Sequence, residues 1–291
     1  MATTEPVGWV SAGEALRWAG QRLGASVERP PVDAELLLRH VLSVTRAELL
    51  AHPARVLTAE EQERLLELVD RRRAGEPLQY LTGTQAFRSL ELAVGPGVLV
   101  PRPETEFVVE RALARLAGAL DPVVVDLGAG SGAICLAIAT ERPDASVWAT
   151  EVSGEAISWA RRNAAGVENV RLLEGDLFEP LSSEMHGRVD LVVSNPPYLS
   201  EAELGKASVD VRDHEPRVAT VSGSTGLEVA ARIVTGALAW LRAGAWLVME
   251  TSPSQAARLE ALMRACYEQA AVLADLSGRL RVAEGRARVP G

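Results

Sequence analysis

The stretch Val124-Val125-Asp126-Leu127-Gly128-Ala129-Gly130-Ser131-Gly132 decides the fold. Its first residues are typical of a buried strand, its glycines of a tight turn, and the apolar run at 133–140 of a helix. Glycines let a ligand approach the backbone closely, and a helix N-terminus supplies unpaired N–H donors. The stretch therefore predicts a cofactor site at the end of the first strand of an α/β domain.

Asp126 indicates which cofactor this turn binds. The same letters satisfy the loose dinucleotide pattern, because Ala133 can replace its third glycine. However, a carboxylate just before the turn would repel a pyrophosphate, whereas it would attract a ligand that carries an ammonium and a sulfonium group and no phosphate. S-adenosylmethionine is such a ligand. We therefore expect S-adenosylmethionine here and treat a nicotinamide dehydrogenase as a weaker alternative.

Two acidic residues follow the next expected strands. Glu151 ends the strand expected at 146–151, where a carboxylate can accept hydrogen bonds from both ribose hydroxyls. Asp176 follows the strand expected at 170–173 and is placed to accept from the adenine amine, with Leu177 against the ring. Each acid alone is more often a solvated loop residue or a helix cap. Parallel strands bring their carboxyl ends to one crevice, and this convergence favours cofactor binding.

A second motif, Asp190-Leu-Val-Val-Ser-Asn195-Pro196-Pro197-Tyr198, is a short apolar strand that must end at its two prolines. If the Asn195 side-chain oxygen and the Pro196 carbonyl each accept one N–H, a planar amide or aromatic amine nitrogen is held with its lone pair facing an electrophile. Tyr198 can stack on the flat face of the substrate. By itself the motif is more often an ordinary loop. Beside the cofactor motif, it predicts methyl transfer to nitrogen.

The rest of the chain indicates two domains. With 291 residues, one α/β domain of about 200 residues can be joined to a small companion. We expect a helical domain at 1–75, a connector with a β-hairpin at 76–103, and a catalytic domain at 104–291. The hairpin is expected to pair 87–94 with 98–100. The catalytic domain is expected to alternate strands and helices, which predicts parallel pairing, with two further strands at 271–276 and 279–283.

Helix-boundary signals are clear in the first domain. Capping-box patterns predict helices after Thr45 and Thr58, and Asp33 is a plausible N-cap for a helix at 34–42. The run 71–73, followed by Gly75, fits a solvated helix C-terminus better than a phosphate site. In the second domain, Pro101-Arg102-Pro103-Glu104-Thr105-Glu106 precedes a helix at 107–116. Its polar groups fit a functional rim and a capped helix start equally well.

Composition limits the partners and the compartment. The formal net charge of −9 argues against nucleic acid as the main partner. The two cysteines, Cys135 and Cys266, lie in apolar helical runs and indicate buried thiols in a reducing cytosol. No uninterrupted apolar run reaches the length of a membrane span. We expect a cytoplasmic protein that acts as a monomer, without a membrane anchor, and the scattered histidines predict no metal site.

Several motifs together resemble the HemK family of class I S-adenosylmethionine-dependent methyltransferases, the peptide chain release factor glutamine methyltransferases. The resemblance extends over nearly the whole length. It is carried by Glu76-Pro77-Leu78-Gln79-Tyr80-Leu81-Thr82-Gly83, by 101–106, 126–132 and 195–198, by His214-Glu215-Pro216 and by Asp275-Leu-Ser-Gly278-Arg279. Glu151 departs from the pattern, since relatives usually have Asp there.

The resemblance implies a Rossmann-like seven-stranded catalytic domain, a hairpin linker and a helical N-terminal domain that helps to hold a protein substrate. It implies methylation of the side-chain amide nitrogen, N5, of the glutamine in the Gly-Gly-Gln loop of release factors, a step that serves translation termination and leaves S-adenosylhomocysteine. By position, 128–132, Glu151, Leu177 and Asn195 would contact the cofactor, and 195–198 the glutamine. No metal is implied.

Two other functions share these motifs. An adenine-specific DNA methyltransferase could use the same Asn-Pro-Pro-Tyr motif, because the exocyclic amine of adenine could bind there as well. Such an enzyme should add a basic domain that reads the target sequence, and none is evident here. A non-catalytic cofactor-binding adaptor should have lost Asn195 or Pro196, and both are present. The roles of Arg102, Glu104, Glu106 and the segment 214–216 stay open.

Overall fold

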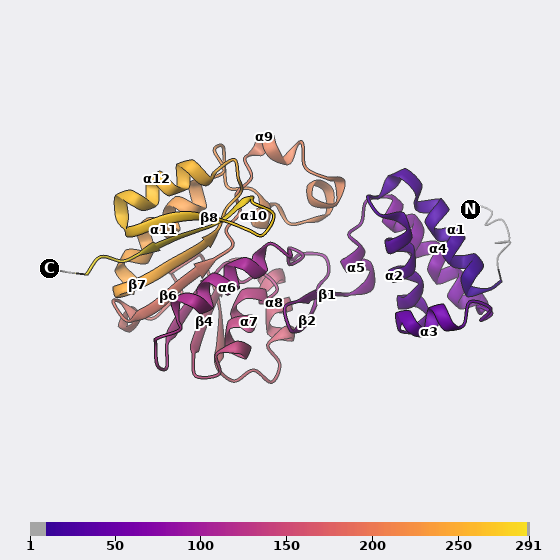
Figure 1. Cartoon of the computed structure of the whole chain (residues 1–291), viewed down its shortest axis with the longest axis horizontal. Helices are drawn as coiled ribbons and strands as arrows, with labels where there is room; N and C mark the ends of the chain where they lie inside the picture. The colour runs from indigo at the N-terminus through magenta and orange to yellow at the C-terminus, as the bar shows by residue number, and fades with distance from the viewer. Residues whose placement is uncertain (1–9, 290–291) are drawn as a thin grey trace. The chain divides into compact units, whose positions relative to one another are not determined.

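The computed structural model describes residues 10–289. The chain separates into two compact units, one ending at Gly83 and the other beginning at Thr84 (Figure 1). The first unit extends beyond the boundary at residue 75 that we expected from the sequence, because a short helix in the connector, α5 (Leu78–Thr82), contacts α2 (Pro30–Leu42) and α4 (Ala59–Arg73). Each unit has its own apolar core.

The first unit is helical, as predicted. Besides the three helices named above, it contains α1 (Ala12–Leu23), a 3-10 turn η1 (Gly24–Ser26) and α3 (Arg46–Ala51). Both predicted capping boxes are present: Thr45 and Thr58 each accept a backbone N–H at the first turn of the following helix. The helices bury most of their leucines in one cluster, which stabilises the unit because apolar surface is removed from water.

The expected role of Asp33 is wrong. Helix α2 begins at Pro30, because a proline at the first helical position lacks only an N–H that the helix could not use. Asp33 therefore lies inside the helix, where its carboxylate accepts a hydrogen bond from buried Arg72 at 2.8 Å. The run 71–73 lies in the last turn of α4, as predicted, and Arg71 there also pairs with Glu67 and Glu76.

The second unit is built on a seven-stranded sheet of order β5-β4-β3-β6-β7-β9-β8, in which only the pairs β7–β9 and β8–β9 are antiparallel. The strands are β3 (Val123–Leu127), β4 (Ser146–Glu151), β5 (Val170–Glu174), β6 (Val189–Ser194), β7 (Leu241–Glu250), β8 (Glu268–Ala274) and β9 (Leu280–Arg286). The order reverses between β4 and β6, on either side of β3. Open α/β sheets bind ligands at such a point.

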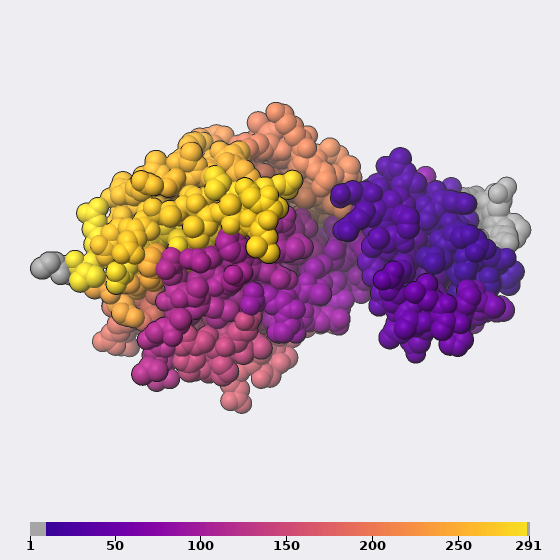
Figure 2. Space-filling view, viewed as in Figure 1, coloured from indigo at the N-terminus to yellow at the C-terminus, as the bar shows by residue number. Residues whose placement is uncertain are grey.

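Helices cover both faces of this sheet (Figure 1). One apolar cluster contains α6 (Thr105–Arg115) and α7 (Ala133–Glu141), and the other contains α11 (Glu228–Trp240) and α12 (Ala256–Cys266). The remaining elements are α8 (Gly154–Asn163), η2 (Ser183–Met185), α9 (Glu201–Leu204), η3 (Asp210–His214) and α10 (Arg217–Thr220). In Figure 2 the C-terminal strands lie against the segment of α6, where buried Glu284 pairs with Arg111 and Arg115.

The hairpin is present but its predicted pairing is wrong. It joins β1 (Thr84–Phe87) to β2 (Leu90–Ala93) through Arg88 and Ser89, whereas 98–100 forms no strand. Arg88 adopts φ 51°, a left-handed conformation that a non-glycine residue rarely takes. Its backbone N–H donates to Glu106, and its guanidinium pairs with Glu141. Tertiary contacts therefore hold a turn that lacks the usual Asn-Gly or Gly signal.

The two cysteines differ in burial. Cys135 is buried as predicted, while Cys266 is only half-buried. Within residues 10–289, no helix is long and apolar enough to cross a membrane. In the same range, His, Cys, Asp and Glu side chains form no group of three or more that could hold a metal ion.

Candidate active site

The sheet register brings the two sequence motifs together. Leu127 of β3 lies opposite Thr150 of β4 and Ser194 of β6, and Ser194 lies opposite Met249 of β7. The Ser194 hydroxyl also donates to the Leu127 carbonyl at 2.6 Å. The next residues along these four strands consequently share one edge of the sheet. These are Glu151, Gly128, Asn195 and Glu250.

The glycine turn leaves open space in front of its backbone. Gly128 and Gly130 have φ of 78° and 57°, and a Cβ added at either position would meet nothing within 4 Å. Gly132, at the start of α7, has φ 88°, and a Cβ there would lie 2.9 Å from Leu136. The first two glycines are therefore open toward a ligand, and the third allows α7 to pack closely against the turn.

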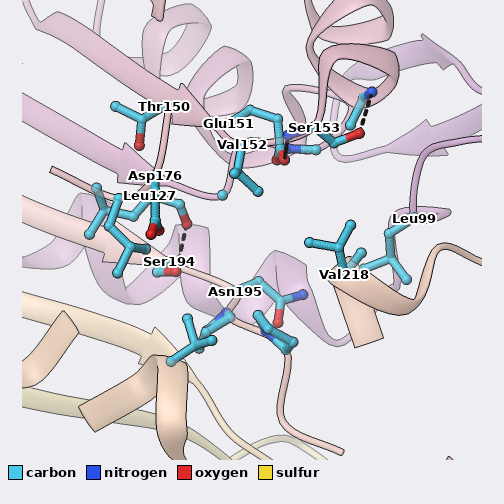
Figure 3. Close-up of a pocket in the computed structure, with 18 of the residues that line it drawn as sticks. Leu99, Leu127, Thr150, Glu151, Val152, Ser153, Asp176, Ser194, Asn195 and Val218 are labelled. Carbon is cyan, nitrogen blue, oxygen red and sulfur yellow. Dashed lines mark hydrogen bonds between the residues drawn. The ribbon is translucent and has the colours of Figure 1, made fainter. Parts of the chain in front are cut away.

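A cavity of about 280 Å³ lies beside this turn (Figure 3). Eight of the residues predicted to contact cofactor or substrate line it: Gly128, Gly130, Glu151, Asp176, Leu177, Asn195, Pro196 and Pro197. Apolar residues such as Leu127, Val152 and Ile233 form much of the rest of its wall. A mostly apolar cavity with a few convergent polar groups is typical of a small-molecule site.

Four predicted cofactor residues lie behind the wall instead of lining the cavity. Ala129, Ser131 and Gly132 are part of the turn, and the backbone N–H of Ala129 is bonded to the Thr150 carbonyl at 2.9 Å. Asp126 is fully buried beneath them, and its Oδ2 accepts the backbone N–H of Cys135 at 3.0 Å. These residues shape the turn from below.

Asp126 nevertheless has an unused acceptor. Its Oδ1 has no hydrogen-bond partner among the described residues, and neither has the Thr150 hydroxyl, which belongs to a residue of the cavity wall. Burial raises the pKa of Asp126 to about 7, and the nearby charge of Glu151 adds to this. A buried polar atom without a partner costs free energy that a polar ligand or an ordered water can recover.

Glu151 holds the glycine turn. Its Oε2 accepts the backbone N–H of Gly130 and its Oε1 accepts that of Ser153, both at 2.9 Å. Each carboxylate oxygen has two lone pairs, so one lone pair on each oxygen is still free to accept from a ligand. Glu151 therefore both holds the glycine turn in place and forms part of the cavity wall.

Asp176 has a partner that sequence reasoning missed. Its Oδ2 accepts from the guanidinium of Arg232 at 2.7 Å, and both residues line the cavity. Arg232 lies on α11, where one arginine in a long amphipathic helix gives no signal of a site. Leu177 follows with φ 48°, and its side chain contributes to the apolar wall.

A buried hydrogen-bond chain supports Asn195. The Asn195 Nδ2 donates to the Thr105 hydroxyl oxygen at 3.2 Å, and the Thr105 hydroxyl donates to Glu250 Oε2 at 2.5 Å. Thr105 and Glu250 are 3% and 2% exposed. Burial raises the pKa of Glu250 to about 7, although the bond from Thr105 lowers it. The sequence left Thr105 open between a functional rim and a helix start, and it missed Glu250, which fits the end of a strand.

Asn195 also lines a second cavity of about 230 Å³. Tyr198, Leu99, Arg102 and Glu215 are among its other wall residues. Arg102 donates to the buried carboxylate of Glu215 at 2.5 Å, and Glu215 also accepts the Val100 backbone N–H. Burial raises the pKa of Tyr198 to about 12, so its phenol stays protonated at neutral pH. These contacts place Arg102 and Glu215, whose roles the sequence left open, at the wall of this cavity, while Pro216 lines the first cavity.

The first cavity fits a nucleoside-type cofactor. The open glycine turn gives backbone access, Glu151 and Asp176 offer carboxylate acceptors, and Leu177 offers an apolar surface for a flat ring. The unpartnered Asp126 and Thr150 oxygens lie close to the same turn. The cavity wall carries the carboxylates of Glu151 and Asp176 and the guanidinium of Arg232, which is already paired with Asp176. The remaining negative charge suits an uncharged nucleoside with a cationic tail better than a diphosphate.

Comparison with solved structures supports the fold class. The T. thermophilus 16S rRNA N2 G1207 methyltransferase matches with a TM-score of 0.53 and 24% identity, over 70% of this chain and 50% of that one. A methyltransferase from Pyrococcus furiosus matches with a TM-score of 0.50 and 19% identity, over 80% and 100%. Together with the seven-stranded sheet, these matches show a class I methyltransferase fold.

Sequence comparison identifies the family. Residues 14–83 match the PrmC N-terminal domain, and residues 105–211 match the methyltransferase small domain. The release factor glutamine methyltransferase of Xylella fastidiosa (strain 9a5c) is 44% identical over 91% of this chain and 96% of its own length. That of Streptomyces coelicolor is 42% identical over 94% and 96%. The chain belongs to the release factor glutamine methyltransferase family.

Proposed function

We propose that this protein transfers a methyl group from S-adenosylmethionine to the side-chain amide nitrogen of a release factor glutamine. Its relatives in Xylella fastidiosa and Streptomyces coelicolor carry that activity in their names. The observation that carries the proposal is the position of Asn195, which lines both cavities at the strand edge. A substrate nitrogen that enters the second cavity and binds to Asn195 would therefore lie next to the cofactor in the first cavity.

The first cavity would hold the cofactor. Glu151 would accept the ribose hydroxyls, Asp176 the adenine amine, and Leu177 would pack on the ring, with Gly128 and Gly130 giving backbone access. Asp126, buried behind the turn, would favour the cationic tail, and the nearby cation would in turn favour the ionised form of this carboxyl. When bound, S-adenosylmethionine supplies an electrophilic methyl group attached to a positively charged sulfur.

The second cavity would receive the glutamine. The Asn195 Oδ1 and the Pro196 carbonyl would each accept one N–H of its amide, since no donor among residues 10–289 bonds either oxygen. These two bonds fix the plane of the amide, so the lone pair of its nitrogen faces the first cavity. Tyr198 would cover the amide and exclude water. The amide proton that is replaced leaves to water, and no strongly basic side chain is needed.

The release factor loop that carries this glutamine, with the sequence Gly-Gly-Gln, is the proposed substrate, and the helical unit would bind the body of the factor. Large side chains, among them Leu99, Arg102 and Tyr198, line the second cavity and leave little room for a bulky segment. Two consecutive glycines have no side chains, so the loop that carries the glutamine could enter it.

A methyl-transfer assay with labelled S-adenosylmethionine tests this proposal. Purified release factor, its Gln-to-Ala variant at the Gly-Gly-Gln loop and duplex DNA would be compared as acceptors. We expect label on the intact factor alone. Label on the Gln-to-Ala variant would place the methyl group elsewhere on the factor, and label on DNA would make the chain an adenine methyltransferase, so either result would refute the proposal.

A further inference from the structure

We propose that Thr105 and Glu250 are positioning residues, which fix the Asn195 side-chain amide so that its oxygen, and not its NH₂ group, faces the substrate. The inference rests on the proposed function, in which this oxygen accepts an N–H of the substrate amide. It assigns a role to two side chains that contact neither cavity, since neither Thr105 nor Glu250 is among the wall residues of either one.

Three separate elements supply the chain of hydrogen bonds. Asn195 follows β6, Thr105 begins α6, and Glu250 ends β7. The register of β6 with β7 places Glu250 next to Asn195 in the sheet, and Thr105 lies between their side chains at 3.2 and 2.5 Å. A segment far away in sequence therefore connects two neighbouring strand ends. Thr105 does not serve as a cap of α6, because its side chain makes no capping hydrogen bond within that helix.

The chemistry of these groups fixes the direction of the chain. An ionised carboxylate only accepts hydrogen bonds, so the single hydroxyl proton of Thr105 must go to Glu250. The Thr105 oxygen then has only lone pairs to offer Asn195, so it must receive an N–H from Asn195. A buried amide whose nitrogen is bound in this way presents its oxygen in the other direction, toward the cavities.

An amide in the reverse orientation would not hold the substrate. An NH₂ group facing the cavity would meet the NH₂ group of the glutamine, and two donors cannot pair. In solution the two orientations of an asparagine differ little in free energy, so a second group must select one of them. Glu250 makes that selection through Thr105 as long as it is ionised.

The surroundings of Glu250 make this dependence measurable. Its burial raises its pKa to about 7; Arg281 of β9 and Arg102 oppose the rise, and Glu104 adds to it. The phenol of Tyr198 also lies within range of its charge but stays protonated. Below pH 7, a protonated Glu250 can donate to Thr105, and the hydroxyl proton is then free to turn toward Asn195. The selection weakens as the pH falls.

Substitutions at Thr105 test the inference by activity. Thr105→Val removes the hydroxyl with little change of shape, and Thr105→Ser keeps the hydroxyl and serves as the matched control. We expect Thr105→Val to lower kcat about 10²-fold, the cost of a misplaced reacting group, with the Kd for S-adenosylmethionine nearly unchanged. Thr105→Ser should stay within about tenfold of the parent. Equal kcat values for the two variants would overturn the inference.

A second variant guards against loss of folding. Thr105→Val leaves the buried Glu250 carboxylate without its donor, which can destabilise the protein. The double variant T105V/E250Q removes that charge while the hydroxyl is still missing. We expect it to regain thermal stability but not kcat. We also expect kcat to rise with pH through about 7 in the parent and to lack this rise in the double variant. Parental kcat in this double variant would overturn the inference.

A spectroscopic measurement separates this inference from the proposed function. The side-chain NH₂ signals of Asn195, assigned by their loss in Asn195→Ala, would be followed by ¹H–¹⁵N NMR as the pH is varied. We expect them to shift with a midpoint near 7 in the parent and to stay constant in Glu250→Gln. This result, combined with a parent that does not label release factor, would refute the proposed function and support the inference. Asn195 signals with the same pH dependence in the parent and in Glu250→Gln would contradict the inference and leave the proposed function untouched.

Discussion

Glu151 accepts the backbone N–H of Gly130 at 2.9 Å, so the carboxylate proposed to bind ribose also holds the glycine turn. Glu151 is where the family resemblance leads us to expect Asp. The longer side chain still spans the gap to the turn and to Ser153. The turn and the ribose site are therefore coupled through one carboxylate, and a change at this residue should affect both.

Substitution of Glu151 tests the cofactor site. We expect Glu151→Ala to weaken S-adenosylmethionine binding by about 10- to 100-fold, because charge-assisted hydrogen bonds contribute roughly 1.5–3 kcal/mol. Glu151→Asp should bind within about tenfold of the parent, since the carboxylate is kept. Isothermal titration calorimetry measures both values. Parental affinity in the Ala variant would exclude Glu151 from the site.

Asp126 should make the ligand-free protein less stable as the pH rises. Its pKa is 3.8 in the unfolded chain and about 7 when folded, so the folded state binds the extra proton between these values. The stability associated with this proton is complete below pH 3.8 and is lost as the pH rises to about 7. We expect Asp126→Asn to show a smaller decline between pH 5 and 8 in chemical denaturation. Parallel curves for parent and variant would contradict the buried, raised-pKa carboxylate.

Asn195→Ala should abolish turnover while S-adenosylmethionine affinity falls only modestly. The substitution removes the proposed acceptor of the substrate N–H but leaves the glycine turn, Glu151 and Asp176 in place. Single-turnover methyl transfer and cofactor titration measure the two effects separately. Near-normal turnover would refute the proposed amide clamp.

Arg102 and Glu215 should be coupled in stability. Arg102→Ala leaves a buried carboxylate without its cation, which we expect to cost roughly 3 kcal/mol of unfolding free energy. Adding Glu215→Gln should recover much of this loss, because a neutral amide oxygen can still accept the Val100 N–H. Urea denaturation of the two single variants and the double variant measures the coupling. Additive losses would show that the pair is not one unit.

Much of the fold follows from local sequence patterns. The strand at 146–151 has the predicted bounds, and both capping boxes occur where Thr45 and Thr58 predict them. Alternating strands and helices predict the parallel pairing. The register follows because each apolar strand ends at a polar residue or a glycine, and these ends lie at the same edge of the sheet. The proximity of Gly128 and Asn195 could therefore be inferred before any coordinates.

The features that sequence reasoning missed depend on contacts between distant segments. Arg88 adopts its left-handed turn because Glu106 and Glu141 hold it, and nothing within the hairpin signals this. Thr105 and Glu250 lie 145 positions apart, and only the folded sheet makes them neighbours of Asn195. Arg232 reaches Asp176 from α11 in the same way. Local patterns predict elements and strand ends, whereas the partners that orient a site residue come from tertiary packing.

The most direct test of the account is a crystal structure of this protein with S-adenosylhomocysteine and a peptide that contains Gly-Gly-Gln. We expect the glutamine amide nitrogen about 2.7–3.2 Å from the Asn195 side-chain oxygen, with the Asn195 nitrogen bonded to Thr105. A glutamine bound away from Asn195, or an Asn195 nitrogen turned toward the peptide, would contradict it.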